Sequence, residues 1–194
     1  MKTGRKAFCC WSGGKESALS LYRAQQSGYN ICCLLNMVSQ DGNHSRTHGI
    51  NSDWLKRQSE SMGIPIIQPK TMWKNYETEF KKAVSELREN RGLKIGIFGD
   101  IDLKPHRDWV ERVCRESDIE PILPLWGEER EKLLEEFISA GFKTIYLFLP
   151  TLTLPAVEAG ILYLVRLRVA RPTERGSLVP IRDSCALRIF LLAA

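Results

Sequence analysis

The chain has 194 residues, of which 43% are hydrophobic and 26% charged, and its formal net charge is +5. This length and balance are typical of a soluble globular domain with a sizeable core. The modest positive charge, without a long block of like charge, tolerates an anionic ligand but gives no clear sign of nucleic-acid binding.

Apolar runs alternate with helical patterns through most of the chain. In order, the predicted elements are a strand at 6–11, a helix at 16–26, a strand at 31–38, a polar loop at 39–51, a helix at 52–62, a strand at 64–67, a helix at 76–90, a strand at 94–100, a helix at 106–117, a strand at 121–126, a helix at 128–140 and a strand at 144–149. This alternation predicts an α/β fold, a parallel sheet of five or more strands with helices on both faces. The helix at 128–140 is amphipathic, and its predicted inner side carries Leu133, Leu134, Phe137 and Ile138.

The segment 151–194 differs in composition from the rest of the chain. It contains six arginines and no lysine, and its acidic residues are Glu158, Glu174 and Asp183. It has no clear alternating order of elements. We therefore expect a domain over 1–150 and an atypical C-terminal tail over 151–194, to which no separate domain is assigned.

The six cysteines include no C-x-x-C pair, and they predict buried, reduced thiols. The apolar run after the basic N-terminus is only about five residues, whereas a signal peptide needs roughly 7–15. No stretch approaches the ~18 apolar residues of a membrane helix. We expect a cytoplasmic protein that does not contact a membrane.

The stretch SGGKES (12–17) follows the first predicted strand and opens the first helix. Glycines allow a tight turn and close approach to a ligand, and the N–H groups at a helix start attract anions. Lys15 adds positive charge, so the residue set suits a phosphate or pyrophosphate. It is not a Walker A loop, because position 9 is Cys and position 16 is Glu. A plain strand-to-helix turn with a surface lysine is the alternative.

SGGKES resembles the S-G-G-x-D-S pyrophosphate loop of ATP pyrophosphatases. Together with the HG of SRTHG, QSESMGIPII, FGDIDLKPHRDWVERVC, IEPILPLWG and REKLLEEFISAGFKT, it makes the chain resemble the diphthine–ammonia ligase family from residue 6 to about residue 146. The resemblance implies a HUP-type fold and ATP-dependent activation of a carboxylate as an acyl-adenylate, with pyrophosphate released and an amide formed from ammonia. In the best-known members the carboxylate is diphthine, a modified histidine on elongation factor 2. The family usually has Asp where this chain has Glu16.

The resemblance implies ATP and Mg²⁺ as ligands. HUP folds commonly hold adenine with backbone groups at the end of the second strand, and the HG motif lies near the nucleotide or the acceptor. The implied ATP-binding residues are Trp11, Ser12, Gly13, Gly14, Lys15, Glu16, Ser17, Asn36, Met37, His48 and Gly99. For Trp11, simple packing is the alternative. The implied metal ligands are Glu16 and Asp100.

A second polar segment, FGDIDLKPHR (98–107), ends the fourth predicted strand, so its side chains could face the same crevice as SGGKES. Carboxylates there could hold Mg²⁺ or orient ammonia, and Arg107 could bind a carboxylate or a phosphate. The alternatives are that Asp102 caps a helix and that Arg107 pairs on the surface. The predicted catalytic residues are Lys15, Asp100, Asp102 and Arg107.

Family members usually continue with segments like G-R-x-L-D and G-E-N-G-E-F-H-T, which help to shape the acceptor site, and neither occurs here. Two functions therefore compete. One is a carboxylate–ammonia ligase that acts on ATP, ammonia and an acceptor such as elongation factor 2. The other is a nucleotide-binding module without a complete acceptor site. A sulfur transferase or RNA-modifying enzyme is disfavoured, because C-x-x-C pairs and a strong basic patch are missing.

Overall fold

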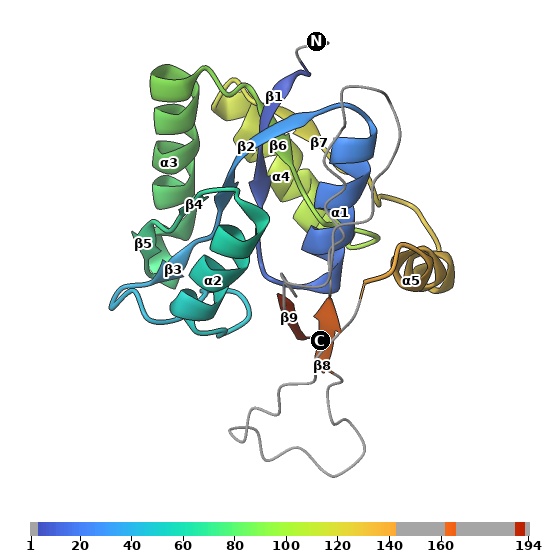
Figure 1. Ribbon diagram of the computed structural model, residues 1–194. Coiled ribbons are helices and arrows are strands. Elements are labelled where there is room, and N and C mark those ends of the chain that lie inside the picture. Colours follow the sequence, from blue (N-terminus) through green and yellow to red (C-terminus); the bar gives the residue numbers. More distant parts are fainter. Residues whose placement is uncertain (1–3, 143–161, 166–188, 193–194) are drawn as a thin grey trace.

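A five-stranded parallel sheet forms the centre of the described part of the chain, which comprises residues 4–142, 162–165 and 189–192 of the computed structural model (Figure 1). The strand order is β4-β2-β1-β6-β7, and each neighbouring pair is parallel. The strands are β1 (Lys6–Cys10), β2 (Asn30–Leu35), β4 (Ile66–Ile67), β6 (Ile95–Ile97) and β7 (Glu120–Ile122).

Helices pack on both faces of this sheet, which confirms the predicted fold class. One face carries α1 (Lys15–Gln26), α2 (Ser52–Met62) and α5 (Arg130–Ser139), and the other carries α3 (Tyr76–Arg91) and α4 (Lys104–Glu116). Alternation along the central strand explains the two cores. Ala7 and Cys9 of β1 pack with α1, whereas Phe8 packs with α3 and α4. Because both faces are covered, the strand reads as a continuous apolar run.

Local sequence signals set an end of each of three helices, α2, α3 and α4. The side chain of Asn51 accepts a hydrogen bond from the Asp53 N–H at 2.9 Å and so caps α2. Gly63 ends α2 and Gly92 ends α3, each with a left-handed φ of 66° and 65° respectively. Pro105 lies in the first turn of α4, where its missing N–H costs nothing, and α4 begins two residues before the predicted start.

All five strands of the central sheet are shorter than their predicted runs, and β6 keeps only Ile95–Ile97 of the run 94–100. The run 31–38 divides, because β2 ends at Leu35 and β3 (Val38–Ser39) pairs instead with β5 (Lys70–Thr71) in a separate two-stranded sheet. The run 121–126 forms only β7. A 3₁₀ turn, η1 (Trp73–Asn75), leads into α3.

The predicted strand at 144–149 lies outside the described residues. Within 151–194 the structure describes one antiparallel pair, β8 (Leu162–Val165) and β9 (Ile189–Leu192). The domain boundary near residue 150 therefore stays a prediction.

The strand order places a topological switch point beside β1. The chain runs from β1 to β2 and β4 on one side, then returns to β6 and β7 on the other. Loops that follow β1 and β6 therefore diverge and leave a crevice at the carboxyl ends of these strands. SGGKES follows β1 and FGDIDLKPHR follows β6, so both polar segments lie at this crevice.

The described cysteines carry free thiols, and Cys185 lies outside the described residues. Burial raises the pKa of the Cys33 thiol to about 11 and that of Cys114 to about 12. None of the described helices has the length and apolar character that crossing a bilayer requires.

Leu34 tests the central packing, because its side chain is fully buried in β2. We expect Leu34→Ala to lower the free energy of unfolding by about 2–5 kcal/mol, since the substitution leaves a cavity. Leu103→Ala is the control, because Leu103 is 53% exposed and should change stability by less than ~0.5 kcal/mol. Urea unfolding of the two variants measures both effects, and equal losses would contradict the described core.

Candidate functional site

A closed loop of small residues joins β1 to α1. Gly13 has a left-handed φ of 78°, which glycine adopts without strain. The Gly14 N–H donates to Ser12 Oγ at 3.1 Å, and Ser12 Oγ donates to Ser17 Oγ at 3.2 Å. Ser17 Oγ in turn donates to the Gly14 carbonyl at 2.9 Å. The hydroxyl groups of Ser12 and Ser17 thus stabilise the turn through hydrogen bonds within the loop.

The start of α1 has no side-chain cap. Gly14 occupies the N-cap position in an extended conformation and offers no side-chain acceptor. The first N–H groups of the helix, together with the helix dipole, therefore form a positive end suited to an anion. Lys15 adds a full charge there, and its Nζ lies 2.5 Å from Glu16 Oε1. Each of these two side chains is 29% exposed, so both can reach a ligand in the crevice.

Gly99 brings the second polar segment against this helix start. A Cβ atom at Gly99 would lie 3.1 Å from the Glu16 carbonyl carbon and 3.1 Å from the Ser17 nitrogen. Both neighbours are backbone atoms, so any larger residue would have to displace α1. The structure therefore brings together the SGGKES loop and the end of β6.

Asp100 lies on the α3 and α4 side of the crevice. Its Oδ1 is 3.4 Å from His106 Nδ1, and its side chain is 22% exposed. Burial raises the pKa of the Asp100 carboxyl, and His106 partly offsets that rise. Burial also raises the pKa of Cys10 and Tyr76, and the charge of Asp100 adds to both shifts. Asp100 is thus a partly desolvated carboxyl group beside the end of β1.

Asp102 and Arg107 both have partners within the protein. Asp102 accepts hydrogen bonds from Arg130 at 2.9 and 3.0 Å, one to each carboxylate oxygen. It does not cap α4, whose N-cap residue is Leu103. Arg107 donates to Glu111 at 2.5 Å, and its guanidinium carbon lies 4.9 Å from the centre of the Trp126 ring. Both side chains are therefore already engaged within the protein, and the Arg130 partner of Asp102 lines a pocket together with Lys15 and Glu16.

Trp11 and Asn36 follow the ends of β1 and β2, on the β2 side of the crevice. Trp11 is only 1% exposed, and its indole N–H donates to Gln58 Oε1 at 2.8 Å. The Asn36 side chain donates to the Trp11 carbonyl at 2.8 Å and to Ser45 Oγ at 3.0 Å. Met37 is also buried, with 5% of its surface exposed. The side chains of these predicted ATP-binding residues are used for packing and for anchoring the 39–51 loop.

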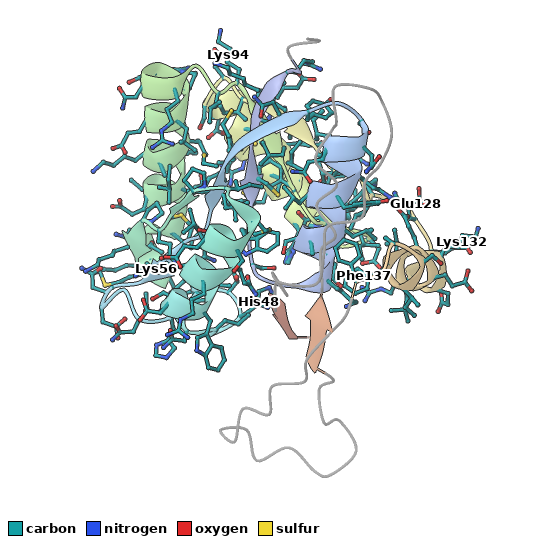
Figure 2. The ribbon with its side chains drawn as sticks, viewed as in Figure 1. His48, Lys56, Lys94, Glu128, Lys132 and Phe137 are labelled. Atoms are coloured by element: carbon teal, nitrogen blue, oxygen red, sulfur yellow. The ribbon has the colours of Figure 1, made fainter. Side chains whose placement is uncertain are left out.

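His48 reaches the start of α1 from the 39–51 loop (Figure 2). Desolvation lowers the pKa of the imidazole, although the residue retains solvent contact at the surface. The Lys15 charge lowers this pKa further, while the Glu16 charge raises it. His48 therefore belongs to the same electrostatic environment as the lysine of the loop.

An apolar pocket of about 180 Å³ opens beside Lys15, between α1 and α5. Its lining consists of the apolar residues Leu19, Ile101, Leu125, Leu133, Leu134 and Phe137 and the charged residues Lys15, Glu16, Arg130 and Glu131. Sequence reasoning missed this pocket and also missed Arg130, which lines it. The only available signal was the amphipathic pattern of α5, which does not show where that helix packs.

No cluster of three or more potential metal ligands occurs among the described residues. The Glu16 backbone lies against Gly99, and Asp100 follows Gly99 in the chain. The carboxylates of Glu16 and Asp100 suit Mg²⁺, because this ion needs only one or two protein carboxylates when phosphates supply further oxygens. Asp102 does not suit it, since Arg130 binds both of its oxygens.

Residues 5–121 match the family of the diphthamide synthase N-terminal domain. The chain belongs to this family. The match covers more than half of the chain and includes every residue predicted for the site, whereas α5 and Arg130 lie beyond it. The family resemblance noted in the sequence is thereby confirmed.

Individual relatives of this diphthamide synthase N-terminal domain are distant. A diphthine–ammonia ligase of Bos taurus is 26% identical over 158 residues, which cover 69% of this chain and 58% of that protein. One of Schizosaccharomyces pombe is 22% identical over 167 residues, covering 77% and 28% respectively. The chain thus spans less than two thirds of the length of these relatives.

A solved structure from Methanocaldococcus jannaschii, described as a predicted subunit of tRNA methyltransferase, aligns with a TM-score of 0.48 at 18% identity. The alignment covers 71% of this chain and 76% of that chain. This likeness is too weak to support a functional argument.

The response of the His48 pKa to the loss of the Lys15 charge tests the position of His48 near Lys15. In the folded protein we expect its imidazole to titrate below the ordinary histidine value of ~6.5. Lys15→Met should raise that pKa, since a nearby positive charge is removed. Lys56→Met on the exposed face of α2 should not move it. NMR titration of the imidazole protons measures all three values.

The lowered pKa of His48 also makes the free energy of unfolding depend on pH. The unfolded chain binds the His48 proton more readily than the folded chain, so the free energy of unfolding should fall as pH drops through the ordinary histidine range. His48→Gln should remove this part of the acid sensitivity. A His48 midpoint at or above that of the unfolded chain would show that desolvation does not lower the pKa of this imidazole.

Proposed function

We propose that the chain binds ATP at the start of α1 and activates a carboxylate by adenylation, after which ammonia forms an amide. The observation that carries the proposal is the uncapped start of α1 with Lys15, held against Gly99 at the switch point of the sheet. The names of the relatives, diphthine–ammonia ligases, support this reaction class. Diphthine on elongation factor 2 is the proposed acceptor by analogy.

The chemistry accounts for the residue types of the loop. A carboxylate oxygen attacks the α-phosphorus of ATP, the bond to the β-phosphate oxygen breaks, and pyrophosphate leaves. Ammonia then attacks the acyl carbon, AMP leaves, and the nitrogen loses a proton. Negative charge grows on the pyrophosphate, so the N–H groups of α1 and the Lys15 ammonium would stabilise the transition state. Ser12 and Ser17 keep these donors in place through their hydrogen bonds.

We assign Mg²⁺ to Glu16 and Asp100. When bound, the ion would neutralise charge on the phosphates. Glu16 contacts Lys15 in the free protein, so the ligand would separate this pair and draw the lysine to the phosphates. Asp100 has no arginine partner among the described residues, and it can turn to a cation without breaking a strong ion pair.

The adenine is assigned to the wall formed at the end of β2. Asn36 would contribute its backbone carbonyl and Met37 its N–H, since the Asn36 N–H donates to the Ile67 carbonyl and the Met37 carbonyl accepts from the Arg46 N–H. His48 closes the same side from the loop, and its lowered pKa favours a neutral imidazole that can accept or donate a hydrogen bond. The roles proposed for Asp102 and Arg107 are less direct, since Arg130 and Glu111 already bind them.

Lys15→Ala tests the phosphate site. We expect ATP affinity to fall by about tenfold or more, because a charge-assisted contact is worth ~1.5–3 kcal/mol. Lys94→Ala is the matched control, since Lys94 is exposed and lies at the other end of the sheet from His48 (Figure 2). Isothermal titration calorimetry with ATP and Mg²⁺ measures both variants. Equal affinities would remove the pyrophosphate loop from the proposal.

The ligase reaction has its own test. With ATP, Mg²⁺, ammonium and a cell extract as acceptor source, we expect AMP and pyrophosphate in equal amounts. Their formation should require the acceptor and should be lost in Lys15→Ala. ADP instead of AMP would contradict adenylation. ATP binding without AMP would favour the alternative, a nucleotide-binding module.

A further inference from the structure

Arg46 lies in the loop that follows β3, and its backbone is fixed near the end of β2. Its N–H donates to the Met37 carbonyl at 2.8 Å, and Ser45 before it is only 2% exposed. His48 follows two residues later, and the Lys15 charge contributes to the lowering of its pKa. The same short stretch of loop therefore extends from Arg46 toward the proposed phosphate site.

The side chain of Arg46 packs against the outer end of a row of aromatic rings. Its guanidinium carbon lies 4.8 Å from the centre of the Trp73 ring, and this cation–π contact holds the guanidinium group in place. Trp73 stacks on Tyr76 with ring centres 5.8 Å apart, and Tyr76 contacts Trp109 of α4 at 5.9 Å. Burial raises the pKa of Tyr76 and the charge of Asp100 adds to that rise, so the inner part of the row lies close to the end of β6.

The positive charge of Arg46 is not balanced within the described part of the chain. Among these residues it has no ion-pair partner, and its buried Nε atom has no hydrogen-bond acceptor. Arg107 and Arg130, by contrast, each bind a carboxylate. Arg46 is half-buried, and such a guanidinium group is stabilised when an anion accepts its hydrogen bonds. Its two Nη atoms form an edge that suits the two oxygens of a carboxylate.

The surroundings of Arg46 are open to a large partner. Trp73 is 62% exposed although it is a large apolar side chain, and Lys74 beside it is exposed as well. Tryptophan and arginine are the residue types that contribute most often to binding energy where proteins meet. A carboxylate carried on another protein can therefore reach Arg46, as the protein-borne acceptor of the proposed function requires.

We infer that Arg46 binds the carboxylate of the protein-borne acceptor through its Nη edge, and that Trp73 positions the guanidinium group for this contact. The assignment deepens the proposed function and rests on it for the reaction, but carboxylate binding at Arg46 can be measured without turnover. It also separates acceptor from product. Amide formation removes the negative charge and replaces one acceptor oxygen by an NH₂ donor, so Arg46 binds the product more weakly.

A matched acid and amide test this discrimination. The probes are imidazolepropanoate, an imidazole with a short carboxylate chain, and imidazolepropanamide, which has nearly the same shape without the charge. We expect the acid to bind at least about tenfold more tightly than the amide, because the amide lacks the charge-assisted contact. Ligand-observed NMR with the full chain, in the presence and absence of ATP, measures both affinities.

Variants of Arg46 and Trp73 locate the binding. Arg46→Met should weaken binding of the acid about tenfold or more, and Arg46→Lys should keep part of the affinity, since lysine retains the charge without the planar edge. Trp73→Ala should weaken it about two- to fivefold, whereas Trp73→Phe, which keeps a ring under the guanidinium group, should restore most of the loss. Arg91→Met is the control, because Arg91 is exposed at the end of α3 that lies away from Tyr76.

We expect binding of the amide and of ATP to stay unchanged in all of these variants. Equal affinities for the acid and the amide, or acid binding that is unchanged in Arg46→Met, would overturn the inference. Loss of ATP affinity in Arg46→Met would also overturn it, because Arg46 would then bind the nucleotide. If ATP binds and the acid does not, this inference fails and the proposed function stands. If acid binding depends on Arg46 while ATP does not bind, the proposed function fails instead.

Discussion

The close approach of Gly99 to the first turn of α1 is the contact on which the site depends. Without a side chain at Gly99, the backbone of Glu16 and Ser17 rests directly on the end of β6. This contact places the open N–H groups of α1 at the switch point between β1 and β6. A larger residue would require the backbone of Glu16 and Ser17 to shift by a few tenths of an ångström, at the point where Lys15 and the loop join α1. The geometry of the site therefore depends on the contact between the segments that follow β1 and β6.

Local signals in the sequence predicted most of the helices because the signals act within a few residues. Asn51 and Gly63 delimit α2, and both are recognisable without any tertiary contact. The division of the run 31–38 was not predictable, because Val38 pairs with Lys70, a partner distant in sequence. Only half of the residues predicted for the inner face of α5 are buried. Leu133 and Phe137 are buried, whereas Leu134 and Ile138 are partly exposed, since periodicity does not show where a helix packs.

Some features of the candidate site could likewise be predicted from the sequence, and others could not. The position of the glycine loop was predictable, because glycines between a strand pattern and a helix pattern mark a tight turn, and Gly13 takes a left-handed φ there. The partners of the charged side chains were not. Asp102 binds Arg130 across 28 positions, and Trp11 binds Gln58 across 47. These pairings depend on which loops the sheet order brings together, so the residue types alone could not separate a ligand contact from an internal ion pair.

The ion pairs at the crevice determine what the proposed ligands would have to compete with. Lys15 contacts Glu16, and Arg130 contacts Asp102, so each cation is balanced by a carboxylate in the free protein. Phosphates with Mg²⁺ would compete for the first pair, because the metal attracts Glu16 while the phosphates attract Lys15. The two cations have separate partners, so a ligand that engages Lys15 need not disturb the pair of Arg130 and Asp102.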